Sequence, residues 1–375
     1  MIHVGWYNLR RDPLRAIVAI VGVTFSVVLI TLETGLLSGL MSNASMLIDT
    51  SRADLWVSAP SIKTFDFATP FQTRARFRIA GVPGVEKVEE FGVSFSAWKL
   101  PCGANAHVEV VGINVRGDLA PRLNVVEGSL DVLHNLEAVF VDEGDLAKLG
   151  HPKIGDIVEI YNRRARVVGF TRGMKSFTTA PYIFTSHRTF PSYSLLGAEG
   201  RPIYLLIKLK PGADPQQVKA AIMSEVTGVD VYTPAELSWK TRRYWLVETG
   251  MGVGFFAAAL LGLLVGGVIV SQSLYAMTVE KLPEFGVMRA MGASTRELAS
   301  IVLEQGLLCG VGGLLLGLII SCTLASLATS AGTTIEVRPP LIVLIVVLTL
   351  LLCSAASVVS ILRLRKVDPA TIFRA

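Results

Sequence analysis

The stretch that decides the fold is TVEKLPEFGVMRAMGAST, residues 278–295, which is charged although long apolar segments lie on both sides of it. Its charged side chains are Glu280, Lys281, Glu284 and Arg289. Proline suits the first turn of a helix and glycine the position after the last turn, so Pro283 and Gly292 bracket a short helix. Ser294 and Glu297 then have the spacing of a capping box, which starts the next helix. The sequence therefore predicts a charged surface helix between two membrane-spanning helices.

The composition is that of an integral membrane protein with a large soluble part. Of the 375 residues, 51% are hydrophobic and 17% are charged, whereas soluble domains average about 25% charged residues. The net charge is +5, but no run of lysine and arginine is interleaved with aromatic residues, so nucleic acid is excluded as an expected partner. Three of the four cysteines fall in apolar segments and Cys102 stands alone in the soluble region, so no disulfide is expected there.

Four apolar segments each exceed the ~20 residues that a transmembrane helix needs. The chain is expected to begin with an interfacial amphipathic helix at 1–12, followed by a first transmembrane span at 13–40 and a soluble domain at 41–244. A second span at 245–277 then leads to the short charged helix at 278–295 and a third span at 296–327. An outer loop at 328–340, a fourth span at 341–363 and a tail at 364–375 complete the layout. In the first segment, Ile2, Trp6 and Leu9 are expected to share the apolar face. Glycines four residues apart in the second and third spans predict close packing of helices, but not which helices pair.

The soluble segment 41–244 is predicted to form an α+β domain. The β-rich run Ile203–Leu209, the helical pattern Asp214–Val226 and the run Val229–Tyr232 together predict a βαβ unit. The other β-rich runs predict a second subdomain made mostly of strands. The expected fold class is a membrane protein with four transmembrane α-helices and a large extracytoplasmic α+β domain between the first and second of them.

The positions of lysine and arginine predict the orientation. Basic residues precede the first span, lie between the second and third spans and follow the fourth: Arg10, Arg11, Arg15, Lys281, Arg289, Arg296, Arg363, Arg365, Lys366 and Arg374. Cytoplasmic loops carry an excess of such residues, so both termini and the 278–295 helix are expected in the cytoplasm and 41–244 in the periplasm. Lys240, Arg242 and Arg243 oppose this rule, but the long domain before them reduces their influence.

The sequence has no arrangement typical of a catalytic or metal site. The segment Gly173–Ser176 lacks the upstream glycine of a phosphate-binding loop, and neither H-E-x-x-H nor G-x-S-x-G occurs. The histidines of the soluble segment have no ligand-like spacing: His107, His134, His151 and His187. No catalytic residue and no metal ligand is therefore predicted.

Two acidic residues lie within the predicted spans, and membrane-embedded acids are functional candidates because they are costly to bury. We interpret Glu33, near the outer end of the first span, as reaching the membrane interface. Glu304 lies deeper in the third span. For Glu304 a functional role and a bond to a neighbouring helix both remain open.

Several segments carry a family resemblance. EKLPEFGVMRAMGA at 280–293 is similar to the pattern E-x-x-x-E-x-G-x-x-(R/K)-A-x-G. NLRRDPLR at 8–15, RLRKVDPATIFR at 363–374 and VDEGDLAKLG at 141–150 are similar to the N-terminal, C-terminal and external segments of the same family. The whole chain thus resembles the MacB/FtsX-like permeases of ABC transporters, the type VII group. The LPEFG sequence, with Pro283, is most similar to the DevC-like branch.

The resemblance implies a non-catalytic permease that works with a separate ABC ATP-binding subunit. That subunit would bind ATP and Mg²⁺, so no cofactor is expected in this chain. A homodimer of permeases in the cell inner membrane is implied, with a periplasmic adaptor (membrane fusion protein) and an outer-membrane channel. ATP-driven motion would pass through the 278–295 helix to the periplasmic domain, a process called mechanotransmission, and drive export. The residues implied in ATPase coupling are Glu280, Glu284, Phe285, Gly286, Met288, Arg289 and Gly292.

Two alternatives to adaptor-linked export remain open. The chain could extract a lipid, lipoprotein or haem from the membrane. It could also signal across the membrane to a periplasmic hydrolase or kinase, as FtsX-like proteins do. All of these functions would use an ATPase bound to the 278–295 helix, and the sequence does not identify a cargo.

Overall fold

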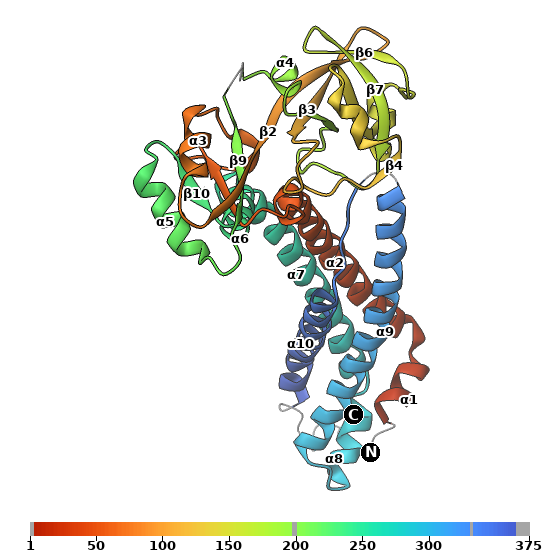
Figure 1. The fold of residues 1–375 in the computed structure, drawn as a ribbon. Coiled ribbons are helices and arrows are strands. Elements are labelled where there is room, and N and C mark those ends of the chain that lie inside the picture. The colour runs from red at the N-terminus through yellow and green to blue at the C-terminus, as the bar shows by residue number, and fades with distance from the viewer. Residues whose placement is uncertain (1–3, 197–200, 331–332, 365–375) are drawn as a thin grey trace. The chain divides into compact units, whose positions relative to one another are not determined.

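The structure is a computed structural model that describes residues 4–196, 201–330 and 333–364 (Figure 1). The chain divides into two compact units. The helical unit combines residues 1–39 with 251–375, and the sheet unit comprises Leu40–Gly250.

The helical unit contains the long apolar helices. Its elements are α1 (Val4–Arg11), α2 (Pro13–Asp49, which continues into the sheet unit), α7 (Met251–Glu280), α8 (Leu282–Ala290), α9 (Thr295–Ser330) and α10 (Pro339–Leu364). Of these, α2, α7, α9 and α10 are long and apolar enough to cross a membrane. The four spans of the expected fold class are therefore present. Residues 365–375 of the expected tail lie outside the described part of the chain.

Glycines determine which of these helices pack together. A Cβ atom at Gly266 of α7 would collide with Ser26 of α2, and the Ser26 hydroxyl donates to the Gly262 carbonyl at 2.7 Å. On α9, Gly313 and Gly317 lie against Val23 and Val27 of α2. Small residues allow this close approach of helix backbones. The helix α2 thus packs against both α7 and α9.

A second glycine pair of α9 joins this helix to α10. Cβ atoms at Gly306 and Gly310 would lie within 3 Å of Ser357 and Cys353 of α10. The remaining pair, Gly250 and Gly254, meets no described atom within 4 Å. The structure therefore supplies the helix pairing that the glycine spacing alone left undetermined.

The sheet unit is built on one mixed sheet in the order β10-β1-β9-β2-β3-β8-β5-β7-β4, with β6 pairing with β2 and β7. Its strands are β1 (Leu55–Ser58), β2 (Val85–Lys99), β3 (Asn105–Ile113), β4 (Val125–Glu127), β5 (Ala138–Asp142), β6 (Ile157–Ile160), β7 (Arg163–Thr171), β8 (Tyr182–Ser186), β9 (Tyr204–Leu209) and β10 (Asp230–Tyr232). Its helices and helical turns are η1 (Phe65–Phe67), α3 (Arg74–Ala80), η2 (Leu130–His134), η3 (Glu143–Leu149), α4 (Phe190–Tyr193), α5 (Pro215–Glu225), α6 (Pro234–Arg243) and η4 (Tyr244–Glu248).

The long strand β2 joins two halves of this sheet. Its residues 85–91 pair with β9, and its residues 92–99 pair with β3. At the junction Gly92 pairs with Gly112, and the ring of Phe190 lies over both because neither has a Cβ atom. The strand β2 therefore links a half of the sheet that contains β9 and β10 to a half made mostly of other strands.

The predicted βαβ unit is confirmed, with one addition. The strands β9 and β10 are connected through α5, and both are antiparallel to β1. They are consequently parallel to each other with β1 inserted between them, which is a split βαβ arrangement. The sequence did not indicate this insertion because β1 comes from a distant part of the chain.

The N-terminal helix α1 packs against α9. Gly5 of α1 lies against Glu304, Leu9 is buried in the core of the helical unit, and Trp6 is 56% exposed. Residues three apart share a helix face, so the apolar face of Trp6 and Leu9 stays a prediction. Ile2 lies outside the described residues.

The glycine contacts lead to a stability prediction. Gly266→Ala should lower the unfolding temperature of the purified chain, because the new methyl group would collide with Ser26 and overpacking costs about 1–3 kcal/mol. Gly254→Ala is the matched control on the same helix, where no described atom lies within 4 Å of the new group. Thermal unfolding in detergent checks this pair. A Gly266→Ala protein as stable as Gly254→Ala would contradict the packing.

Candidate functional site

The ends of α8 explain why it is a separate helix. Lys281, just before it, has φ −86° and ψ 3°, and Pro283 occupies the first turn of α8 and cannot donate a backbone hydrogen bond. After α8, Gly292 has φ +103°, which glycine adopts without steric cost. The predicted capping box is confirmed: the Ser294 amide donates to Glu297 Oε2 at 2.7 Å, and the Glu297 amide donates to Ser294 Oγ at 3.3 Å.

One buried aromatic residue fixes α8 to the start of α9. Phe285 is 2% exposed and packs in a cluster with Leu298, Ile301 and Val302. Burying such a side chain contributes roughly 1.5–3 kcal/mol. Gly286 is buried beside it. Within this chain, Phe285 and Gly286 therefore hold α8 in place, and their predicted role in ATPase coupling stays a prediction.

The exposed face of α8 differs in part from the predicted one. Glu284 is exposed, and its Oε1 atom accepts from Lys281 Nζ at 2.7 Å. Val287 is 48% exposed and Met291, just after the helix, is 76% exposed. Residues three and four apart share a helix face, so Glu284, Val287 and Met291 form one outward surface, which we call the α8 face. Val287 and Met291 were not among the predicted coupling residues, although their spacing from Glu284 is a usable signal.

The other predicted coupling residues lie around this face. Met288 and Arg289 are half-buried, and Gly292 is exposed in the turn that follows α8. Glu280 belongs to α7, where its carboxylate pairs with Arg15 of α2. Arg15 also bonds Asp12 at 3.1 Å. The structure thus separates Glu280 from the α8 face and uses it to join α7 to the beginning of α2.

Glu304 lies beneath the N-terminal helix. A Cβ atom at Gly5 would be 2.8 Å from the Glu304 carboxyl group, so the two residues are in close contact. An acid near the first turn of a helix is favoured by the unpaired backbone N–H groups there. This position supports a role in holding α1 against α9. Glu33 is half-buried on α2.

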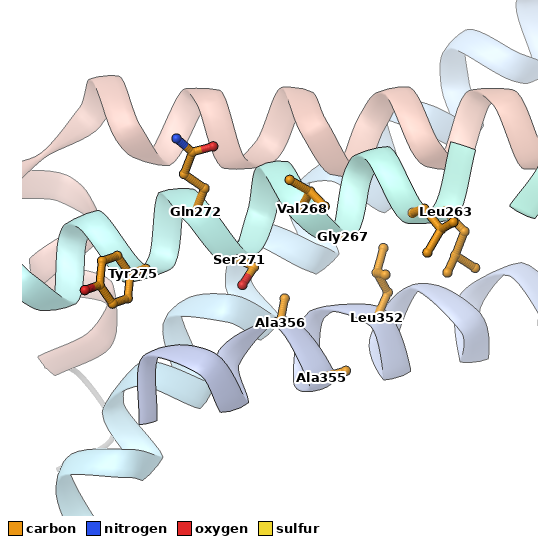
Figure 2. Close-up of a pocket in the computed structure, with 10 residues that line it drawn as sticks. Leu263, Gly267, Val268, Ser271, Gln272, Tyr275, Leu352, Ala355 and Ala356 are labelled. Carbon is orange, nitrogen blue, oxygen red and sulfur yellow. The ribbon is translucent and has the colours of Figure 1, made fainter. Parts of the chain in front are cut away.

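A shallow groove runs between α7 and α10, with a volume of about 580 Å³ (Figure 2). Leu263, Val268 and Leu352 line its apolar part, and Gln272 and Tyr275 lie toward one end. The lining offers apolar contact with few polar groups. Among the described residues, no group of three or more His, Cys, Asp or Glu side chains could hold a metal ion.

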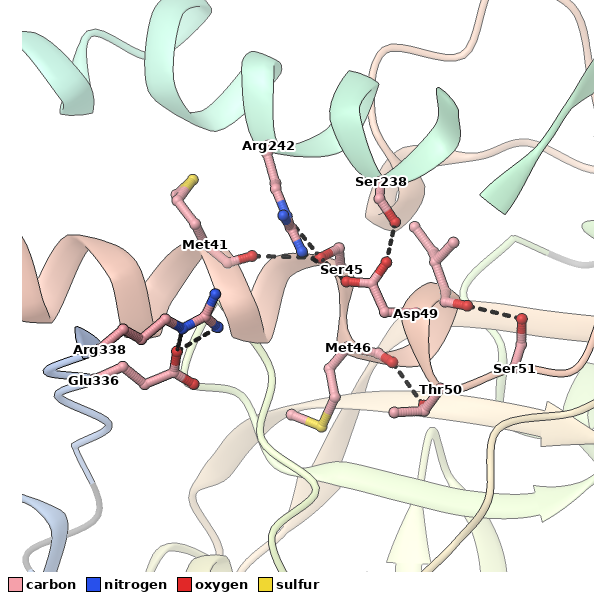
Figure 3. A network of polar contacts seen from close by, with 11 residues as sticks. Met41, Ser45, Met46, Asp49, Thr50, Ser51, Ser238, Arg242, Glu336 and Arg338 are labelled. Carbon is pink, nitrogen blue, oxygen red and sulfur yellow. Dashed lines mark hydrogen bonds and ion pairs between the residues drawn. The ribbon is translucent and has the colours of Figure 1, made fainter. Parts of the chain in front are cut away.

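A polar network in the sheet unit joins the end of α2 to α6 (Figure 3). Asp49, the last residue of α2, pairs with Arg242 at 2.6 Å and accepts from Ser238 at 2.5 Å. Ser45 completes the network by donating to Asp49 at 2.7 Å and accepting from Arg242 at 2.9 Å. This pairing of Arg242 was not predicted from the sequence, because its partner lies far away along the chain.

Comparison with known proteins places both units in one family. The MacB-like periplasmic core domain matches residues 16–225, and the FtsX-like permease C-terminal domain matches residues 256–369. An ABC transporter permease of Mycobacterium tuberculosis, itself uncharacterized, is 24% identical over 384 residues, which cover 100% of this chain and 99% of the relative. The periplasmic region of MacB from Actinobacillus actinomycetemcomitans aligns with 12% identity and a TM-score of 0.38, over 51% of this chain and 94% of that one.

Other relatives are matched over only part of their length. An uncharacterized ABC transporter permease of Methanocaldococcus jannaschii is 26% identical over 190 residues, or 48% of this chain and 46% of the relative. The macrolide export ATP-binding/permease protein MacB of Agrobacterium fabrum is 25% identical over 240 residues, or 59% of this chain and 36% of that protein. Because the periplasmic-core match alone covers more than half of the chain and the permease match covers most of the remainder, the chain belongs to the MacB/FtsX-like permease family of ABC transporters.

Proposed function

We propose that this ABC transporter permease is a non-catalytic subunit that couples ATP hydrolysis in a separate ATPase to movement of the sheet unit, and that this movement drives export. The proposal rests on the composition and exposure of the α8 face. Val287 and Met291 are exposed apolar side chains next to the Glu284 carboxylate, on a helix that Phe285 anchors. An apolar surface with a charged residue at its edge is typical of a protein-binding site.

The fixation of α8 suits the transmission of force. A partner that moves α8 also moves the start of α9, because Phe285 packs against Leu298 and Ile301. It also moves the end of α7, since α8 follows it after a single residue. The pair between Glu280 and Arg15 extends this connection to α2. Three spanning helices would therefore respond to one contact.

The helix α2 is suited to carry the movement outward. It is uninterrupted over 37 residues, which at 1.5 Å per residue is roughly 55 Å, well beyond a ~30 Å hydrocarbon core. Its last turn is bonded to α6 through Asp49 and Arg242. For this reason we propose that the end of α2 and the helix α6, through which the chain enters and leaves the sheet unit, move together.

The proposed assembly follows the family resemblance. It contains two copies of this permease and two ATPase subunits that bind ATP and Mg²⁺. A periplasmic adaptor and an outer-membrane channel complete it. We place it in the inner membrane with both termini in the cytoplasm, as the distribution of lysine and arginine favours. The name of the MacB relative supports export, and Pro283 supports the DevC-like branch.

Membrane extraction is a second candidate function, favoured by the groove between α7 and α10. Its apolar lining and its place on two spanning helices suit an acyl chain. Mass spectrometry of the purified complex would distinguish the two functions. Stoichiometric lipid or lipoprotein that Leu352→Trp removes supports extraction. The absence of such a ligand, with an adaptor bound instead, supports adaptor-linked export.

The first functional prediction tests the α8 face. Glu284→Lys should abolish co-purification of the ATPase subunit while the permease is still inserted in the membrane, because it reverses the charge that the α8 face presents. Glu86→Lys makes the same change at an exposed glutamate of the sheet unit and should leave co-purification intact. Gly286→Pro should also abolish binding, because proline inside a helix costs about 3 kcal/mol and would break α8. An ATPase that is retained by both α8 variants would refute the assignment.

The second prediction tests the connection between α2 and α6. Arg242→Gln removes the charge that pairs with Asp49, so ATP should no longer change the sensitivity of the sheet unit to added protease. ATPase binding should remain, since α8 is unaltered. Arg243→Gln is the matched control, because Arg243 is exposed next to Arg242 in the chain. A normal ATP-dependent protease pattern in Arg242→Gln would exclude this route.

The third prediction tests the orientation. Cys102 is exposed in the turn between β2 and β3, whereas Cys309 and Cys353 are buried and Cys322 lies within the spanning helix α9. A membrane-impermeant maleimide should therefore label the protein in intact spheroplasts, and Cys102→Ser should remove that label. Labelling of Cys102 only after the membrane has been opened would reverse the proposed topology.

A further inference from the structure

Two buried acidic side chains face each other in the sheet unit. Asp66, on η1, is 4% exposed, and Glu109, on β3, is fully buried. Aspartate and glutamate are almost never fully buried unless a partner compensates their charge. Neither residue takes part in the α8 face or in the network around Asp49, so this pair requires its own explanation.

The hydrogen bonds around the pair leave one position unfilled. Asp66 Oδ2 accepts from Thr64 Oγ1 at 3.4 Å and from Trp245 Nε1 at 3.3 Å. Glu109 Oε2 accepts from Ser176 Oγ at 2.8 Å. No donor among the described residues reaches Glu109 Oε1. The Asp66 carboxyl lies within hydrogen-bonding reach of Glu109. Ionised carboxylates only accept, so this contact is a hydrogen bond only when a proton lies between them.

The surroundings favour the protonated form. Burial raises the pKa of Asp66 to about 6, although the hydrogen bond from Trp245 opposes this. Burial and the negative charge of Asp66 raise the pKa of Glu109 well above its usual value, with the Ser176 hydroxyl opposing. The other titratable groups that sense the pair are Tyr182 of β8 and Tyr204 of β9, whose pKa values it raises further. A tyrosine side chain is neutral or, once deprotonated, negative, so neither tyrosine supplies a compensating positive charge.

We propose that Asp66 and Glu109 bind one proton between them, and that this shared proton joins η1 and β3 to the segment that leads into α7. The third element of this contact is Trp245, on the π-helical turn η4. Its indole donates to Asp66. The centroid of its ring lies 4.2 Å from the ring centroid of Phe177 and 6.1 Å from that of Phe67. The proposal concerns the sheet unit alone and does not depend on the identity of the transported molecule.

The pair titrates as a unit, with two apparent pKa values. Between them it holds one proton, and the contact is a carboxyl–carboxylate hydrogen bond. When the pH rises through the higher value, which belongs mainly to Glu109, two negative charges face each other in a buried site. That repulsion should separate η1 from β3 and release Trp245. Protonation would thus control how firmly the entry to α7 is held.

The sign of the effect on stability follows from the raised pKa values. Acids whose pKa is higher in the folded state stabilise it fully at pH values below their unfolded pKa. They lose this contribution as the pH rises through the folded pKa. The unfolding temperature of the full-length chain in detergent should therefore fall as the pH rises through about 6, the pKa of Asp66, and should continue to fall above it as Glu109 loses its proton. The part of the fall at lower pH reflects loss of the proton from Asp66, and the part at higher pH reflects loss of the proton from Glu109.

The decisive variant is Glu109→Gln. The glutamine amide donates to Asp66 at every pH and replaces the shared proton, so the unfolding temperature at alkaline pH should approach its value at neutral pH. Asp66→Asn makes the same replacement from the other side and serves if Glu109→Gln does not fold. Glu89→Gln is the matched control: Glu89 is also buried, but it pairs with Lys87 at 2.6 Å. It should keep the pH profile of the wild type.

A second measurement follows Trp245 directly. Acrylamide should quench tryptophan fluorescence of the wild type more strongly at alkaline than at neutral pH, and this difference should disappear in Trp245→Phe and in Glu109→Gln. Identical pH profiles for the wild type and Glu109→Gln in both measurements would overturn the proposal. So would stabilisation of the wild type, but not of Glu109→Gln, by millimolar Ca²⁺ or Mg²⁺, because the pair would then hold a metal ion instead of a proton.

Discussion

The helical unit depends on the close approach of helix backbones in a medium that provides no hydrophobic drive for helix association. Lipid tails are as apolar as leucine, so van der Waals packing and polar contacts must hold the spans together. Gly266 provides both, because it admits Ser26, whose hydroxyl bonds to the neighbouring Gly262 carbonyl. Gly313 likewise admits the side chain of Val23, and this contact consists of van der Waals packing alone. The helix α2 thereby contacts both α7 and α9.

The short helix α8 divides two tasks between its two sides. Its inner side is set by Phe285, which needs the first turns of α9 to cover it. Its outer side exposes the apolar side chains of Val287 and Met291. Exposing apolar surface costs free energy, and nothing within the described part of the isolated chain offsets this cost. Exposed apolar side chains grouped on one face are typical of interaction sites, which supports the proposal that a partner binds there.

Local signals in the sequence were sufficient for some features and not for others. Pro283, Gly292 and the Ser294–Glu297 box act within a few residues, and the structure confirms the breaks that they predicted. The spans follow from apolar length alone. The insertion of β1 and the bond between Asp49 and Arg242 join residues far apart in the chain, where no periodicity reveals the partner. The burial of Phe285 was not predicted for the same reason, since it depends on α9.

The short segment 242–245 takes part in two polar contacts of the sheet unit. Arg242 is bonded to Asp49 at the end of α2, and Trp245 is bonded to Asp66 in the core of the sheet unit. The two side chains are three residues apart, so they lie close together on one helical turn. Movement of α2 and a change in the charge of the buried pair would therefore act on the same few residues before α7. If the membrane helices transmit force, this turn is where the sheet unit can modulate it.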